Sequence, residues 1–132
     1  MTPNGLPGLP VRIRTYLDAH TRHDVPTAAG CFGPAPVVVD DGRTHRGRDA
    51  VRAWLDRTSA EYTYTTTPLT AVPHDDLRWT VTQRLEGDFP GGTVDLAHAF
   101  TLDDDGRITK LTITAFIEAN HAYLARSADA EV

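Results

Sequence analysis

The chain has 132 residues, of which 40% are hydrophobic, and its 18 acidic and 13 basic side chains give a formal net charge of −5 at pH 7. This length suits one domain with a single core. The acidic balance and the scattered arginines argue against a nucleic-acid-binding face. No apolar run is long enough to cross a bilayer, and the first residues lack a secretory signal pattern. We therefore expect a cytoplasmic protein whose partner is a small molecule or another protein.

The first half of the chain carries the helical signals. Residues 1–9, rich in proline and glycine, predict a flexible tail that ends at Pro10, a residue suited to the first turn of a helix. Asp24 can cap a second, short helix over residues 25–32. Between them, residues 11–23 predict a first helix with one inward stripe, made of Ile13, Tyr16, Leu17 and His20.

A short hairpin and a third helix come next. Residues 37–40 are rich in valine, and the Asp41-Gly42 pair after them is a strong signal for a tight turn that leads into residues 43–46. Gly47 then opens a helix that runs to about residue 60. Its apolar stripe is Val51, Trp54, Leu55 and Thr58.

The second half of the chain has the period-two alternation of β-strands. Residues 62–72 are rich in threonine and tyrosine, and Pro68 among them indicates a bulge or an edge strand. Residues 77–85 alternate apolar and polar side chains, as do two runs within residues 93–117 that flank an aspartate-rich turn. In this alternation His98 faces the same side as the apolar residues Leu96 and Phe100.

Helices followed by strands predict the α+β class, with three helices packed on the concave face of a curved antiparallel sheet and a cavity between the layers. We expect the domain to span residues 10–118, with a tail over residues 119–132. Cys31 is the single cysteine, so it forms neither an internal disulfide nor a zinc cluster. Neither HTRHD at residues 20–24, interpreted as a solvated helix end, nor the aspartate-rich turn has a recognised metal-ligand spacing. No metal or cofactor is expected.

Three stretches of the sequence carry a resemblance to a known family. They are YLDAHTRHD, VVVDDGRTHRGRDAV and FTLDDDGRITKLTI, and with them residues 10–117 resemble the SnoaL-like branch of the nuclear transport factor 2-like superfamily. The resemblance implies a cone-shaped fold. It leaves the activity open, because the superfamily includes ketosteroid isomerases, polyketide cyclases, epoxide hydrolases, dehydratases and domains without catalysis. Limonene epoxide hydrolases carry an Asp-Arg-Asp set on their strands, and no inward-facing arginine is evident here.

The ketosteroid isomerase pattern implies three catalytic residues. Tyr16 falls on a tyrosine that donates a hydrogen bond to the substrate oxyanion, and Asp40 falls on the aspartate general base. His98 falls on the position of a protonated aspartic acid, the second oxyanion donor, so a donor is kept. Each residue also has a plain structural reading: Tyr16 as a packing residue, Asp40 as a turn residue and His98 as a core histidine. The expected walls of the substrate cavity are Trp54, Trp79, Gln83, Phe100 and Ile113.

Two functions follow as hypotheses. The first is a cofactor-independent acid/base enzyme, isomerase-like or cyclase-like, acting on a small or polycyclic carbonyl compound in a hydrophobic pocket. The second is a domain that binds a ligand without transforming it, or that fills its own cavity with Trp54 and Trp79. The outward face of the sheet predicts a homodimer, because its residues suit sheet-to-sheet packing: Arg78, Thr80, Thr82, Arg84, Thr101, Thr112, Thr114 and Phe116.

Overall fold

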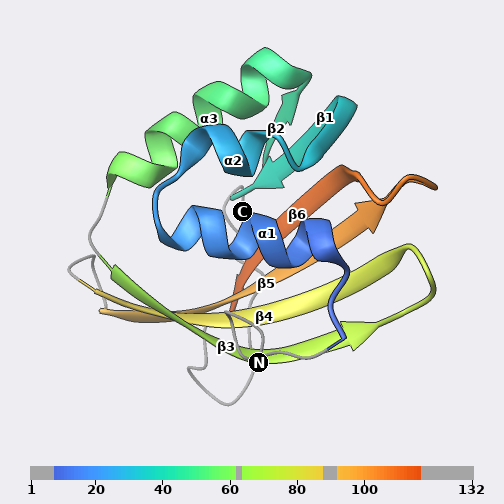
Figure 1. Cartoon of the computed structure of the whole chain (residues 1–132). Coiled ribbons are helices and arrows are strands. Elements are labelled where there is room, and N and C mark those ends of the chain that lie inside the picture. Colours follow the sequence, from blue (N-terminus) through green and yellow to red (C-terminus); the bar gives the residue numbers. More distant parts are fainter. Residues whose placement is uncertain (1–7, 62–63, 88–91, 117–132) are drawn as a thin grey trace.

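The computed structural model describes residues 8–61, 64–87 and 92–116 (Figure 1). The expected short helix after residue 117, the whole expected tail over residues 119–132 and residues 1–7 of the expected N-terminal tail lie outside the described residues. Leu9, at the end of the expected N-terminal tail, is buried and belongs to the core. No helix in the described part of the chain is long and apolar enough to cross a membrane.

Three helices form one layer. α1 spans Val11–Thr21, and four of its side chains are buried: Ile13, Tyr16, Leu17 and Ala19. α2 spans Val25–Ala29 and begins as expected, with the Asp24 side chain accepting a hydrogen bond from the Thr27 backbone N–H at 3.3 Å. α3 spans Arg48–Glu61. The prediction that the second helix continues to residue 32 is wrong, because Phe32 already pairs with Ile108 in the sheet.

Six strands form one curved sheet, in the order β2-β1-β6-β5-β4-β3. The α+β class and the cone-like arrangement are confirmed. The strands are β1 Phe32–Asp40, β2 Arg43–Arg46, β3 Tyr64–Pro73, β4 Arg78–Gly87, β5 Thr93–Leu102 and β6 Ile108–Phe116.

One ladder differs from the expected antiparallel sheet, since β1 pairs with β6 in parallel. β1 also begins earlier than expected and passes through two prolines, where the pairing register breaks between Phe32 and Val37. Proline cannot donate to a ladder, which explains the break. Asp41 and Gly42 close the β1–β2 hairpin with φ angles of 55° and 79°, the positive values that a two-residue turn of this kind needs. Pro68 lies in edge strand β3 beside a register shift, as predicted.

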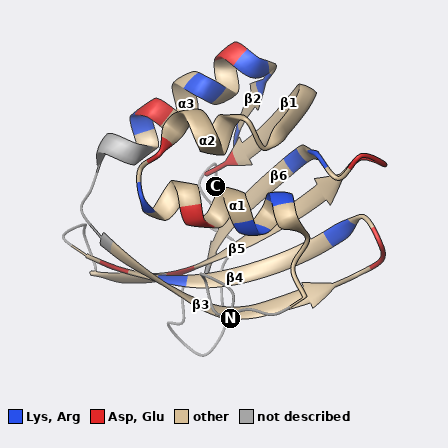
Figure 2. Cartoon of the chain, viewed as in Figure 1, with Lys and Arg blue, Asp and Glu red and all other residues tan. Residues whose placement is uncertain are grey.

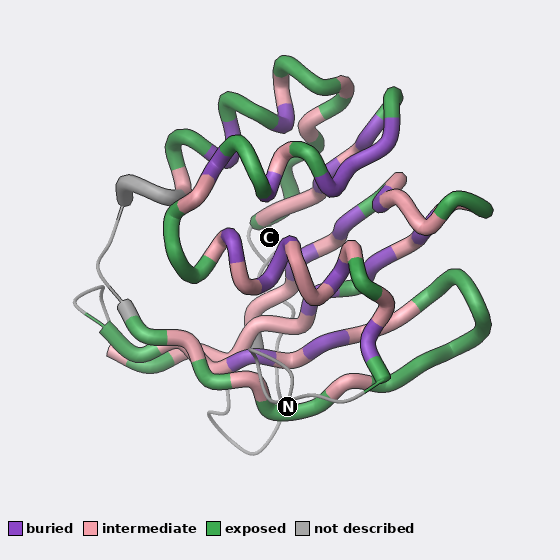
Figure 3. The backbone as a smooth tube through the Cα atoms, viewed as in Figure 1, coloured by how far each residue is buried: buried purple, intermediate pink, exposed green. Residues whose placement is uncertain are grey.

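Pairing across the sheet sorts the inward side chains into rows, because directly paired residues point to the same face. The row that we call the deep row contains Val38, Leu111, Phe100 and Trp79. The next row, which we call the cavity row, contains Asp40, Ile113, His98 and Val81. Figure 3 shows buried residues on the inner side of α1 and along the central strands. Figure 2 shows charged residues mainly along the helices and at the turns.

Candidate functional site

A cavity of about 170 Å³ lies between the helices and the sheet. Its walls combine aliphatic side chains with several hydrogen-bonding groups. The cavity is lined by His20, Asp40, Trp54, Thr58, Thr66, Gln83, Leu85, Leu96, His98 and Ile113. Thus Asp40, His98, Trp54, Gln83 and Ile113, all proposed from the sequence as site residues, meet in one space.

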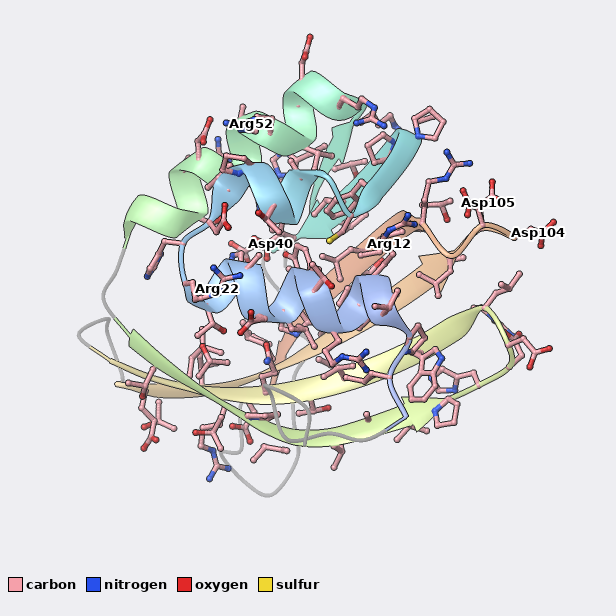
Figure 4. The ribbon with its side chains drawn as sticks, in the orientation of Figure 1. Arg12, Arg22, Asp40, Arg52, Asp104 and Asp105 are labelled. Atoms are coloured by element: carbon pink, nitrogen blue, oxygen red, sulfur yellow. The ribbon has the colours of Figure 1, made fainter. Side chains whose placement is uncertain are left out.

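Asp40 is fixed at the end of β1 by a tryptophan. The indole Nε1–H of Trp54 donates to Asp40 Oδ2 at 2.9 Å. Trp54 is only 2% exposed, so this donor is held in place by packing of its ring. In Figure 4 Asp40 lies near the middle of the molecule, whereas Asp104 and Asp105 at the β5–β6 turn point outward. The contact gives the carboxylate one defined orientation at the cavity.

His98 is a buried histidine on the floor of the cavity, with 6% of its surface exposed. Its ring stacks on Phe100, with 6.2 Å between ring centroids and 16° between planes. Burial, helped by the charge of His20, lowers the pKa of His98 from 6.5 to about 4, and hydrogen bonding to the backbone of Leu96 and Val81 opposes this shift only in part. The imidazole is therefore neutral at pH 7, and a neutral ring offers one N–H donor and one acceptor nitrogen.

His20 is the one ionisable residue among the described cavity residues that the sequence interpretation missed. Its ring stacks between Tyr16 at 5.7 Å and Trp54 at 6.5 Å, measured between ring centroids. Burial, with a smaller contribution from His23, lowers the pKa of His20 to about 4. The signal was present in the apolar stripe of residues 11–23, which includes His20, but the motif HTRHD suggested a solvated helix end.

Both cavity histidines hold a ring nitrogen that lacks a partner. Within the described residues, His20 Nε2 and His98 Nδ1 are buried and accept or donate no hydrogen bond. A buried polar atom left unsatisfied costs about 1–3 kcal/mol. Such atoms are rare in folded proteins, so each one calls for an explanation, such as a catalytic role or a bound water or ion.

Three predicted site residues lie away from the cavity lining. Phe100 and Trp79 belong to the deep row, one step of about 6.8 Å further along the strands than the cavity row. Tyr16 packs edge-on against Phe100 at 5.8 Å and against Phe32 at 5.6 Å, so it lies over the deep row as well. Four residues further along α1, a rise of about 6 Å, His20 reaches the cavity.

The two histidines predict a pH-dependent stability. Their pKa values are lowered on folding, so the unfolded chain binds more protons than the folded one between pH 4 and pH 6.5. The free energy of unfolding is therefore highest above pH 6.5 and is lost as the pH falls toward 4. For His98 the shift from 6.5 to about 4 corresponds to about 3 kcal/mol.

Urea denaturation at pH 7.0, 5.5 and 4.5 measures this effect, and His98→Gln should flatten the dependence. Three carboxyl groups also have pKa values lowered from 3.8, those of Asp24, Asp75 and Asp103. The stability that they contribute is lost mainly below pH 4, outside the pH range of the two histidines. The lowered pKa of His45, due mainly to burial, adds in the same direction. An equal dependence in wild type and His98→Gln would contradict the assignment to His98.

No group of three or more metal-ligating side chains comes together in residues 8–61, 64–87 and 92–116. Cys31 is buried, and its Sγ lies 3.4 Å from the Thr27 carbonyl oxygen, to which it donates. Burial raises the pKa of the Cys31 thiol to about 11. This thiol is therefore protonated at neutral pH and is a packing group.

Comparison with protein families matches residues 13–111 to the SnoaL-like domain. The match covers three quarters of the chain, which therefore belongs to the SnoaL-like domain family. This confirms the resemblance seen in the sequence. A comparison with curated proteins gave no match.

Several solved structures share the fold. A suspected polyketide cyclase from Sinorhizobium meliloti is 33% identical, with 80% of this chain and 94% of that chain covered and a TM-score of 0.73. A Mycobacterium tuberculosis protein, solved in complex with estradiol-17β-hemisuccinate, is 18% identical over 78% of this chain and 89% of that chain, with a TM-score of 0.66. SalBIII, an epoxide hydrolase/cyclase-like enzyme with a role in pyran ring formation in the polyether salinomycin, is 18% identical over 78% of this chain and 86% of its own, with a TM-score of 0.67.

Proposed function

We propose that the chain is a cofactor-independent acid/base enzyme that moves a proton next to a carbonyl group. The observation that supports this most is the cavity itself, where an oriented carboxylate, Asp40, and a buried neutral histidine, His98, belong to one row of the sheet. A carboxylate held beside aliphatic side chains can act as a general base. The likeness to a suspected polyketide cyclase agrees with such chemistry.

The mechanism needs two groups. Asp40 removes a proton from the carbon beside the carbonyl, and the electron pair of that C–H bond moves into the enolate. The N–H of neutral His98 donates to the enolate oxygen while its charge develops. Trp54 Nε1–H donates to one oxygen of Asp40 and so fixes the orientation of the carboxylate in the cavity. In this mechanism Tyr16 does not touch the substrate. Its ring stacks on His20 and so positions the His20 ring at the cavity.

A single-ring ketone can test this proposal without knowledge of the natural substrate. Removal of a proton from C2 of cyclohex-3-enone and return of a proton at C4 gives the conjugated ketone, cyclohex-2-enone, which absorbs in the ultraviolet. We expect the protein to accelerate this conversion, or the uptake of deuterium at C2 in D₂O followed by NMR, above the rate in buffer. Rates equal to buffer for this ketone and for polycyclic carbonyl compounds would reject the enzyme.

Binding without chemistry is the alternative. It is favoured by the Mycobacterium tuberculosis relative, which was solved with a bound steroid derivative. The same NMR experiment separates the two functions, because a binding domain would broaden or shift the ketone signals without exchanging its hydrogens. The cavity is not filled by Trp54, and Trp79 is not among its lining residues, so a plugged structural domain is disfavoured.

We further propose a two-fold homodimer through the outward face of the sheet. Pairing places small side chains in two adjacent rows there: Thr80, Ala99 and Thr112, and Thr82, Ala97 and Thr114. At one end Arg84 and Asp95 form a two-bond ion pair, with Nε–Oδ1 at 2.8 Å and Nη2–Oδ2 at 3.0 Å. A flat face of threonine and alanine can pack on a second copy of itself. The side chain of Phe116 lies outside the described part.

Ala99→Arg should break this dimer, since a charged side chain in the middle of the flat face prevents close packing. Sedimentation velocity at micromolar concentration should then show a dimer for the wild type and a monomer for Ala99→Arg. Ala53→Arg places the same charge on an exposed position of α3 and should remain a dimer. A wild-type mass of one chain at every concentration would rule out the assembly.

A further inference from the structure

The unpaired nitrogens of His20 and His98 set the chemistry of the ligand. The two rings come to the cavity from different layers, His20 from α1 and His98 from β5, and they are close enough for the charge of His20 to lower the pKa of His98. Each ring has a buried nitrogen without a partner in the described part of the chain. A ligand oxygen between the rings would give both nitrogens a hydrogen bond, because a hydroxyl or carbonyl group is small enough to serve two imidazoles.

The charges of the cavity wall restrict the ligand further. Of the ten described residues that line the cavity, Asp40 is the one acidic side chain, both histidines are neutral at pH 7, and none is a lysine or arginine. An anionic ligand would be repelled by this carboxylate, with no lysine or arginine among the described lining residues to attract it. A cationic ligand would lose its water against Leu85, Leu96 and Ile113, and one oxygen of Asp40 already accepts from Trp54. An uncharged ligand avoids both costs.

The volume of the cavity limits the size of the ligand. The space of about 170 Å³ is close to that of an engineered cavity of about 150 Å³ that binds benzene. Pockets for drug-sized ligands begin at about 300 Å³. A single six-membered ring therefore fits within the described walls, whereas four fused rings would have to extend beyond them.

We propose that the cavity binds an uncharged compound of about one ring, whose oxygen hydrogen-bonds to both His20 and His98. This inference rests on the proposed function and narrows its substrate from small or polycyclic carbonyl compounds to small neutral ones. It assigns His20, on α1, as a second ligand-contacting residue beside His98. It also explains why two imidazoles are buried neutral in a wall that contains a carboxylate.

Four probes of related shape test the ligand class on the wild-type protein. They are cyclohexanone, cyclohexanecarboxylate, cyclohexylammonium and estradiol, and binding is measured by titration with NMR detection of the histidine ring signals. We expect cyclohexanone to bind and to shift the signals of His20 and His98. The charged probes and estradiol should bind at least about tenfold more weakly, on the order of 1.4 kcal/mol. Equal or tighter binding of any of these three probes would overturn the proposal.

Single substitutions test the two contacts. His20→Gln and His98→Gln should each weaken cyclohexanone binding by roughly five- to tenfold, the size expected for one hydrogen bond. His74→Gln, a change at an exposed histidine in the β3–β4 turn, should leave binding unchanged. Unchanged binding in folded His20→Gln protein, checked by circular dichroism, would overturn the role of His20.

Failure of this inference can be told apart from failure of the proposed function. Asp40→Asn should keep cyclohexanone binding while it loses proton exchange, because the ligand oxygen contacts the histidines and not Asp40. Exchange of a polycyclic ketone without binding of cyclohexanone would leave the acid/base function standing and reject the small-ligand inference. Binding of cyclohexanone through both histidines without any exchange would leave the small-ligand inference standing and reject the acid/base function.

Discussion

Replacement of Asp40 by asparagine should lower the rate of cyclohex-3-enone conversion by about 10²- to 10⁴-fold, the range that a positioned general base contributes. Asparagine keeps the shape of the side chain and an oxygen that can accept from Trp54 Nε1–H, which lies 2.9 Å from Asp40 Oδ2. It cannot take up a proton at neutral pH. The fold and ligand binding should therefore persist while the reaction stops.

Asp41→Asn is the matched control for this substitution. Asp41 is the next residue along the chain, is exposed and has a φ of 55°, a value that asparagine tolerates. The variant removes the same charge at nearly the same place without touching the cavity wall, and it should keep the wild-type rate. Full activity in Asp40→Asn would show that Asp40 is a turn residue and that another group is the base.

Phe100→Ala should cost about 3–5 kcal/mol of the free energy of unfolding. Phe100 is 1% exposed, and its ring contacts both Tyr16 and His98. Truncation to alanine leaves a hole in the deep row beneath α1, which the surrounding rings cannot fill without moving. This loss is a large part of the total of about 5–15 kcal/mol that holds a domain folded.

Urea denaturation at pH 7 measures the effect, with Val11→Ala as the control. Val11 is 62% exposed, so its truncation should change stability by no more than about 0.5 kcal/mol. Because Phe100 is absent from the cavity lining, any Phe100→Ala protein that remains folded should still bind cyclohexanone. A loss of binding without a loss of stability would show that Phe100 is part of the cavity wall, as the sequence predicted.

Local pattern alone predicted much of this fold. Periodicity located the three helices and the strands, and the Asp41-Gly42 pair predicted the turn that closes the first hairpin, where both residues have positive φ. The two-residue alternation also showed that His98 faces inward, since the side of a strand on which a residue lies depends only on its position in that strand. The end of α2 was missed, because Phe32 pairs with Ile108, far along the chain.

The composition of the site was decided by tertiary structure. A sequence pattern tells which face a residue occupies, but the register between elements decides how far along that face it lies. Pairing places Asp40 beside Ile113 and Ile113 beside His98, and it places Phe100 one row deeper. The position of α1 over those rows brings His20, and not Tyr16, to the cavity. The neutrality of both histidines follows from burial between the two layers, which no stretch of sequence contains by itself.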